Sequence, residues 1–113
     1  MPQLDATFAA LSDPTRRAIL ARLSRGEATV TELARPFAMS QPAITKHLNV
    51  LERAGLVARR REGRQRPVHL TAAPLGEATE WLDAFRALWE ARYAKLDQLL
   101  AELQSDTHPR QEP

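Results

Sequence analysis

The 113-residue sequence contains no cysteine, which excludes a disulfide framework and any metal site built from thiolates. It has only four glycines, and these are scattered, so it lacks a glycine-rich phosphate-binding loop. No apolar run approaches the ~20 residues that a membrane-spanning helix needs, and no signal-peptide pattern opens the chain. We therefore expect a soluble, cytoplasmic protein that does not enter a membrane.

Residue groupings typical of catalysis or metal binding are also missing from the sequence. Carboxylates are plentiful, but none stands beside a histidine or serine at a catalytic spacing, so we predict that the protein is not an enzyme. No pair among His47, His69 and His108 has metal-ligand spacing, and we predict neither a metal nor a cofactor. We interpret His47 as a residue at the core boundary, bonded to backbone or phosphate.

The charge is distributed unevenly along the chain, although the formal net charge is only +2. Residues 1–71 hold twelve Lys and Arg against six Asp and Glu, a net charge of +6. Residues 72–113 hold four against eight, a net charge of −4. The basic part favours contact with a polyanion such as nucleic acid, while ordinary surface solvation is the alternative explanation.

Helix caps and hydrophobic spacing predict several short helices, then a hairpin and a long helix. Asp13 before Pro14 is an N-cap followed by proline at the first helical position, and Thr29 begins a stretch with capping-box spacing. Ser40 caps the next helix, which Gly55 ends. The predicted helices are 4–11, 14–23, a short one from Thr29 that Pro36 keeps brief, 40–54, and one from between 71 and 75 to about 103; the predicted strands are 56–61 and 66–70, around a turn at 63–65.

This order of elements is that of a winged helix-turn-helix, a mainly α fold with a small β-hairpin. We expect one domain over residues 1–104, with dimerisation helices at 4–11 and 74–103 and a disordered polar tail over 105–113. Pro67 predicts an edge position for the second strand, because proline cannot donate a ladder hydrogen bond.

The helix over residues 40–54 carries a polar face opposite its apolar one. Amide side chains pair with base edges in the DNA major groove, lysine binds guanine or phosphate, and threonine reaches a thymine methyl group or a phosphate. We predict that this recognition helix enters the major groove and presents Ser40, Gln41, Pro42, Thr45, Lys46 and Asn49. The alternative is an ordinary solvated helix face.

The wing of the predicted hairpin, residues 59–66, holds five arginines against the single acidic residue Glu62. Strand alternation would put Arg59 and Arg61 on one side. Arg64 at the tip is the best candidate for a phosphate or minor-groove contact. We predict that Arg59, Arg61, Arg64 and Arg66 contact DNA, whereas charge that protects an edge strand from aggregation is the alternative role.

The long helix has more apolar surface than one small domain can cover. Its apolar residues follow a 3-4 spacing, and a second flank widens the coverage, so a second copy of the chain is the simplest additional partner. A small apolar effector could enter between paired helices, although plain dimer packing is the simpler expectation. The walls of that cavity would be Trp81, Phe85, Leu88 and Trp89.

Three segments closely resemble the ArsR/SmtB family of winged helix-turn-helix repressors: 40–57 its recognition helix, 13–20 its second helix, and 32–34 the start of its helix-turn-helix. With the wing and the last helix, the resemblance covers about residues 4 to 103. It implies a homodimer joined through the first and last helices, bound to a pseudo-palindromic operator in double-stranded DNA and repressing its own operon. The implied interface residues are Leu4, Phe8, Leu82, Phe85, Trp89, Leu96, Leu99 and Leu103.

The sequence departs from the metal- and thiol-sensing members of that family. Positions 33–35, where thiol sensors carry cysteines, are Leu, Ala and Arg, and Asp83 is not followed by the histidine of the zinc-sensing pair. The wing and the last helix resemble a branch that lacks metal sites and is often encoded beside START-like proteins. A winged-helix module that binds protein rather than DNA remains the alternative, favoured by Trp81 and Trp89.

Overall fold

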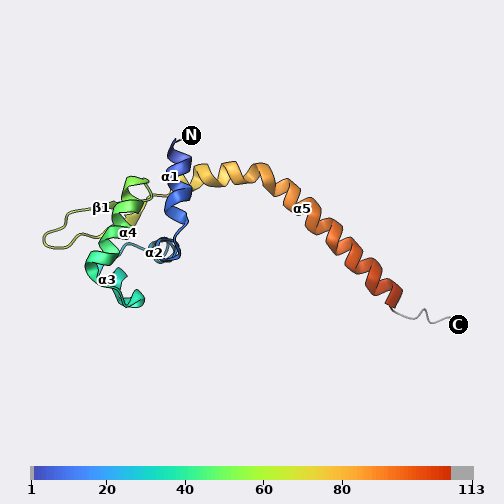
Figure 1. Ribbon diagram of the computed structural model, residues 1–113, viewed down its shortest axis with the longest axis horizontal. Helices are drawn as coiled ribbons and strands as arrows, with labels where there is room; N and C mark the ends of the chain where they lie inside the picture. Colours follow the sequence, from blue (N-terminus) through green and yellow to red (C-terminus); the bar gives the residue numbers. More distant parts are fainter. Residues whose placement is uncertain (1, 108–113) are drawn as a thin grey trace. The chain divides into compact units, whose positions relative to one another are not determined.

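The computed structural model describes residues 2–107 of the chain (Figure 1). Two units are distinguished, one ending at Thr79 and the other beginning at Glu80. The elements are α1 (Pro2–Leu11), α2 (Pro14–Leu23), α3 (Val30–Ala34), the 3-10 helix η1 (Arg35–Phe37), α4 (Gln41–Arg53), β1 (Val57–Arg59), β2 (Val68–Leu70) and α5 (Ala73–Thr107). The predicted class, mainly α with one hairpin, is confirmed.

The helices begin at the predicted caps. The Asp13 carboxylate accepts the backbone N–H of Arg16 at 3.0 Å at the start of α2. Thr29 and Glu32 form the reciprocal capping box of α3, and the Ser40 hydroxyl accepts the N–H of Ala43 at 3.3 Å. Each of these side chains accepts a hydrogen bond from a backbone N–H group in the first turn of the helix, where such groups have no intrahelical acceptor. Because this interaction spans only three residues, the starts of these helices could be predicted from the sequence.

The connection between α3 and α4 is a tight turn. Pro36 falls in η1, where the α-helical hydrogen-bond pattern has already ended, so its missing N–H is tolerated. Ala38 then adopts a left-handed backbone with φ of 51°, which reverses the chain before Ser40. The helix before this turn is brief, as predicted.

The hydrophobic core of the first unit is built from α2, α3, α4 and the hairpin. Its fully buried large side chains include Ile19, Leu33, Ile44, Leu48, Leu51, Leu56 and Val68. On α1, Thr7 is buried while Phe8 is 36% exposed. The Thr7 hydroxyl donates to the carbonyl oxygen of Gln3 at 3.0 Å, so its burial leaves no unsatisfied donor.

The hairpin is antiparallel, with Val57 opposite Leu70, and its two strands are shorter than predicted. Beyond the strands, Glu62 and Gln65 exchange backbone hydrogen bonds of 3.0 Å around a tip in which Gly63 has φ of 59°. Glycine adopts this left-handed conformation without the steric cost that a Cβ would bring.

The second strand lies at an edge of the two-stranded sheet, as predicted, but one of its residues, Val68, also forms an isolated bridge. Val68 exchanges backbone hydrogen bonds of 2.8 and 3.1 Å with Ala28, on the side away from β1. Pro67 precedes β2, and its carbonyl oxygen accepts the N–H of Arg60 at 3.0 Å. Proline removes a donor only at its own position, so the next residue can pair on both sides.

Helix α5 is one element of 35 residues. It includes residues 105–107 of the predicted tail, because no glycine or proline interrupts residues 77–107. The rest of the predicted tail lies outside the described residues. From Glu80 on, α5 forms the second of the two compact units. None of the helices in the described range is long and apolar enough to span a lipid bilayer.

Candidate nucleic-acid interface

The polar residues of helix α4 face outward because the opposite face of the helix is buried in the core. Ile44, Leu48 and Leu51 are completely buried. The predicted reading residues lie on the remaining surface, where Thr45 is half-buried and the others are exposed: Ser40, Gln41, Pro42, Lys46 and Asn49. The structure therefore brings the predicted α4 residues together on one accessible face.

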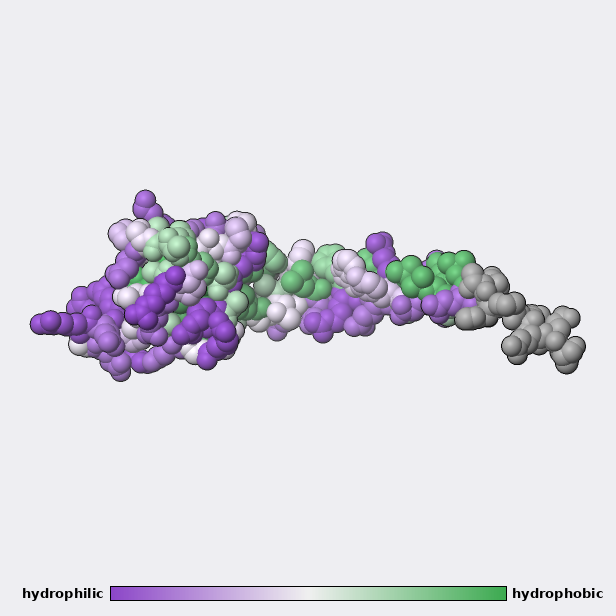
Figure 2. All heavy atoms as spheres, turned by 90° about the horizontal axis from the view of Figure 1, so that it is seen from below, coloured by the Kyte–Doolittle hydropathy of each residue, from purple (hydrophilic) through white to green (hydrophobic). Residues whose placement is uncertain are grey.

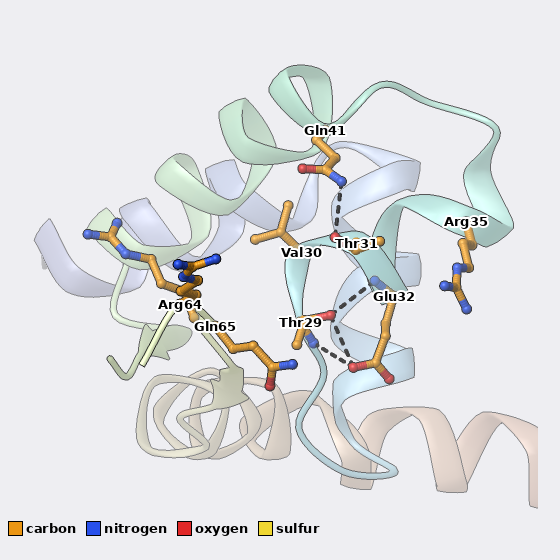
Figure 3. A pocket seen from close by; sticks show the side chains of 9 residues that line it. Thr29, Val30, Thr31, Glu32, Arg35, Gln41, Arg64 and Gln65 are labelled. Atoms are coloured by element: carbon orange, nitrogen blue, oxygen red, sulfur yellow. Dashed lines mark hydrogen bonds between the residues drawn. The ribbon is translucent and has the colours of Figure 1, made fainter. Parts of the chain in front are cut away.

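A side-chain hydrogen bond links the two helices of the helix-turn-helix, α3 and α4. The Nε2 of Gln41 donates to the Thr31 hydroxyl at 3.0 Å, which joins the first turn of α4 to α3 (Figure 3). This bond holds the Gln41 side chain over the turn. Its carbonyl oxygen is the half of the amide that remains for an outside donor.

His47 is half-buried between α4 and the start of α2, which confirms its position at the core boundary. Its Nδ1 lies 3.9 Å from a carboxylate oxygen of Asp13 and 3.5 Å from a guanidinium nitrogen of Arg16. Its polar contacts are thus with side chains, not with the backbone as expected. The pKa of Asp13 is lowered from its ordinary value, chiefly because the carboxylate accepts the N–H of Arg16.

Arg59, one of the predicted DNA contacts, is half-buried. Its side chain is only 13% exposed, and its Nε lies 3.4 Å from a carboxylate oxygen of Glu52. Its Nη2 donates a hydrogen bond to Oδ1 of Asn49. Because β1 ends at Arg59, strand alternation does not relate it to Arg61. Arg59 is therefore engaged within the protein, where it bridges the wing to α4.

The other arginines of the wing, residues 59–66, divide into two kinds. Arg60 pairs with Glu27 at 3.0 Å and with Glu62 at 3.6 Å. Three more are exposed and form no ion pair within residues 2–107: Arg61, Arg64 and Arg66. Three of the five wing arginines are therefore available to bind an anion outside the protein.

Two open hollows flank the wing. The larger, of about 510 Å³, lies between the wing tip, the start of α3 and the first residue of α4 (Figure 3). It is lined by Thr29, Val30, Thr31, Glu32, Arg35, Gln41, Arg64, Gln65 and Arg66. The smaller, of about 260 Å³, is lined by Glu52, Arg59, Arg60, Arg61 and Arg66. Arginine outnumbers acid in both, so both favour an anion over a cation.

Glu32, the acidic residue of the larger hollow, is held by the capping box. Its carboxylate accepts the backbone N–H of Thr29 at 3.2 Å and the Thr29 hydroxyl at 3.0 Å. These hydrogen bonds lower the pKa of Glu32 from its ordinary value. Figure 3 shows its side chain turned toward Thr29.

Some of the basic excess of residues 1–71 serves the fold itself. Arg16 donates to the carbonyl oxygen of Ala10 at 2.7 Å, and Arg17 donates to that of Leu11 at 2.7 Å. Both bonds satisfy carbonyl groups at the end of α1 that have no intrahelical donor. The net charge of this segment therefore overstates the number of cations available to a ligand, which sequence counting could not reveal.

The second unit exposes a continuous series of large apolar side chains. The exposed fractions lie between 44% and 60% for Trp81, Leu82, Phe85, Leu88, Trp89, Tyr93, Leu96, Leu99, Leu100 and Leu103. Ring pairs one turn apart, Trp81 with Phe85 and Trp89 with Tyr93, add to this face. Figure 2 shows hydrophobic residues, in green, gathered along one side of this helix.

The α1 residues of the predicted interface behave differently from one another. Phe8 is partly exposed, whereas Leu4 is 8% exposed and packs inside its own unit, which leaves little of its surface for a second protomer.

Within the described part of the chain, no group of three His, Cys, Asp or Glu residues could hold a metal ion.

Comparison with known families places a helix-turn-helix domain over residues 11–60. The chain is 41% identical over 92 residues to the HTH-type transcriptional regulator Rv2034 of Mycobacterium tuberculosis, covering 81% of this chain and 86% of the relative. It is 35% identical over 79 residues to the transcriptional repressor SdpR of Bacillus subtilis, covering 70% and 88%.

Solved structures agree with these relatives. The crystal structure of an ArsR family transcriptional regulator superposes with a TM-score of 0.71 at 46% identity, covering 78% of this chain and 97% of that one. A homodimeric winged helix-turn-helix DNA-binding domain from Mycobacterium bovis superposes with a TM-score of 0.59 at 26% identity, covering 98% and 89%.

Proposed function

The chain belongs to the ArsR/SmtB family of winged helix-turn-helix transcriptional regulators, and we propose that it binds a pseudo-palindromic operator as a homodimer and represses transcription, including that of its own operon. It is a DNA-binding regulator, and the alternative of a protein-interaction module is not supported by its relatives. Regulators of this family are not enzymes. An operator lies in the compartment that holds the DNA. Because Mycobacterium tuberculosis and Bacillus subtilis, the sources of the two relatives named above, are bacteria, the proposed location is the cytoplasm.

The observation that carries the proposal is the common surface of α4 and the wing. Gln41, Lys46 and Asn49 stand on the accessible face of a helix whose opposite face is buried. A helix of this kind fits the width of the major groove, where amide and ammonium groups distinguish base pairs. Lys46 is a candidate for guanine or phosphate, and Thr45, half-buried, for a thymine methyl group.

The exposed wing arginines supply the sequence-independent part of binding. Arg64 sits at the hairpin tip, and Arg61 and Arg66 stand on either side of it, all without an internal ion pair in the described range. The phosphate backbone is proposed to run along the hollows that flank the wing. Such contacts position the protein and make binding depend on salt.

Dimerisation is supported by the apolar face of α5. A helix with ten large hydrophobic side chains about half-exposed is rarely left facing water, and a second copy of the same helix offers a matching surface. The proposed contact residues are Leu82, Phe85, Trp89, Leu96, Leu99 and Leu103, with Phe8 as a further candidate. An apolar effector between paired helices, beside Trp81 and Leu88, would act only through unequal affinity for two dimer arrangements.

The test is binding of the full chain to DNA from just upstream of its own coding region. Fluorescence anisotropy is measured against that duplex and against a shuffled duplex of equal composition, over a range of salt concentrations. A dimer that neutralises about 6–10 phosphates should give a slope of log K against log salt of roughly −5 to −9. Half-sites should lie roughly 34 Å apart, one helical turn. Equal, weak binding to both duplexes at low salt would refute the proposal.

A further inference from the structure

The side chains of Arg59 and Asn49 connect the wing to the recognition helix. Arg59 is the last residue of β1, and Asn49 lies in α4 on the accessible face. The Arg59 Nη2 donates to Oδ1 of Asn49, and its Nε lies 3.4 Å from Oε2 of Glu52, which is three positions further along α4. One guanidinium group therefore bridges two residues on adjacent turns of the helix.

This contact determines which atoms Asn49 presents to an outside partner. Arginine carries only N–H donors and keeps its charge at any ordinary pH, so only the oxygen of the amide can face it. The Oδ1 acceptor of Asn49 is thereby occupied. Within residues 2–107 its Nδ2 group donates no hydrogen bond, and this donor is the part of the amide that remains for DNA.

The orientation matters because base edges differ in what they accept. An asparagine that reads adenine in the bidentate manner needs both halves of its amide, the donor for N7 and the acceptor for the N6 amino group. Guanine presents two acceptors, N7 and O6, and requires donors alone. An asparagine that offers only its amide N–H donors can still bind the acceptors N7 and O6 of guanine, but it cannot form the bidentate pair with adenine.

We propose that Arg59 is a positioning residue that makes Asn49 a donor-only reader, so that the operator carries guanine rather than adenine at the base that Asn49 meets. The inference rests on the proposed placement of α4 in the major groove. It assigns to Arg59 an effect on base preference, in contrast to Arg61, Arg64 and Arg66, whose effects are on affinity for any sequence.

Glu52 keeps Arg59 in this role. The Arg59 side chain is 13% exposed, and its Nε lies 3.4 Å from the Glu52 carboxylate, which holds the guanidinium in its inward position. For Arg59 to turn outward to a phosphate, it would have to give up both the Glu52 ion pair and the Asn49 hydrogen bond. Charged hydrogen bonds of this kind are the stronger ones in proteins, which favours the inward position.

The test compares base preference, not overall affinity. The wild-type full chain first selects its sequence from a random duplex library, and Kd is then measured for duplexes with each base replaced. One position in each half-site is expected to prefer guanine over adenine. Arg59→Met, which keeps the length of the side chain but cannot donate, is expected to reduce that preference at least about fivefold. Arg59→Lys retains a donor-only cation and should keep most of it.

Asn49 and Arg61 provide the matched controls. Asn49→Ala should abolish discrimination at that position and remove any further effect of Arg59→Met. Arg61→Met makes the same chemical change elsewhere in the wing and should weaken binding to all duplexes without altering the guanine-to-adenine ratio. Asn49→Asp keeps an acceptor for Arg59 but has no donor, so it should lose the guanine preference while changing the side-chain volume little.

The outcomes separate this inference from the proposed function. If the wild type selects a sequence but Arg59→Met leaves every base ratio unchanged, or shifts ratios equally in the Asn49→Ala background, the role of Arg59 is refuted and the regulator function stands. If Arg59→Met does not fold by circular dichroism, Asn49→Asp decides, since a retained guanine preference in that variant contradicts the proposal. If the wild type selects no sequence at all, the proposed function itself fails.

Discussion

The Nε2 atom of Gln3 donates a hydrogen bond of 2.7 Å to the carbonyl oxygen of Ala54, 51 positions further along the chain. Ala54 is the C-cap residue of α4 and is almost fully buried. The contact satisfies one of the carbonyl groups that a helix end leaves without an intrahelical donor. It links α1 directly to the end of α4, so one helix cannot move relative to the other unless this hydrogen bond breaks.

Replacing Gln3 by alanine should therefore destabilise the first unit. We expect Gln3→Ala to lower the free energy of unfolding by about 0.5–1.5 kcal/mol, the net value of one partly buried hydrogen bond. Urea denaturation followed by circular dichroism measures the change. Gln98→Ala, the same substitution at an exposed position of α5, is the control and should stay within about 0.5 kcal/mol of wild type. Superimposable curves for all three proteins would contradict the prediction.

The proposed cationic contacts predict how affinity changes when each charge is removed. Lys46→Ala and Arg64→Ala should each weaken operator binding by about 1–3 kcal/mol, and a residue that contacts phosphate should also reduce the salt slope by about one. Gel-shift titrations at several salt concentrations measure both quantities. Arg25→Ala removes an exposed charge that lines neither hollow beside the wing, and its affinity should stay near that of wild type. Unchanged binding by Lys46→Ala and Arg64→Ala would reject this placement of helix and wing.

Acid should destabilise the fold through the two carboxylates that cap helices. Hydrogen bonding to backbone N–H groups lowers the pKa of Asp13 and of Glu32 below their ordinary values of 3.8 and 4.5. Below about pH 5 the unfolded chain therefore binds more protons than the folded one, so stability is fully present above the ordinary values and is lost as pH falls through the lowered ones.

Urea denaturation between pH 3 and pH 7 measures this effect. In Glu32→Gln one of the two titrating caps is removed, so stability should fall less steeply with acid than in wild type. Glu80→Gln, a change at an exposed carboxylate of α5, should leave the slope unaltered. Equal slopes in wild type and Glu32→Gln would show that the capping box does not contribute to acid sensitivity.

The apolar face of α5 predicts an oligomeric state that a single charge should disrupt. Leu99→Glu would place a carboxylate in the proposed interface twice, once from each protomer, and should raise the dimer dissociation constant at least about a hundredfold. Sedimentation equilibrium gives the constant, and circular dichroism verifies that α5 remains helical. Gln98→Glu introduces the same residue beside it, on a polar position, and should leave the dimer intact. A monomeric wild type would reject the dimer proposal directly.

Helix boundaries were accessible from the sequence because their causes are local. Asp13, Thr29 and Ser40 each cap the helix that they precede, through bonds to residues three positions away. The buried face of α4 was equally predictable, since Ile44, Leu48 and Leu51 repeat with the period of the helix. These predictions depended only on residues a few positions apart, and they were confirmed.

The roles of individual cations were not accessible in this way. Arg59 and Arg61 look equivalent in the sequence, yet one is bound to Glu52 and Asn49 and the other is exposed. The isolated bridge between Val68 and Ala28 likewise joins residues that no local pattern connects. Local sequence patterns reveal charge and hydrophobic periodicity, but they do not reveal which distant side chain contacts a given residue in the folded protein.

The amino-acid sequence by itself determined the order of the helices and the hairpin, the starts of α2, α3 and α4, and the polar and apolar faces of α4 and α5, because capping and amphipathic periodicity act over a few residues. Only the tertiary structure decided which arginines of the wing remain available for an anion and which half of the Asn49 amide faces outward. The physical reason is that hydrogen bonds and ion pairs between distant elements depend on the packed arrangement of the core, which brings together groups that the linear sequence keeps apart.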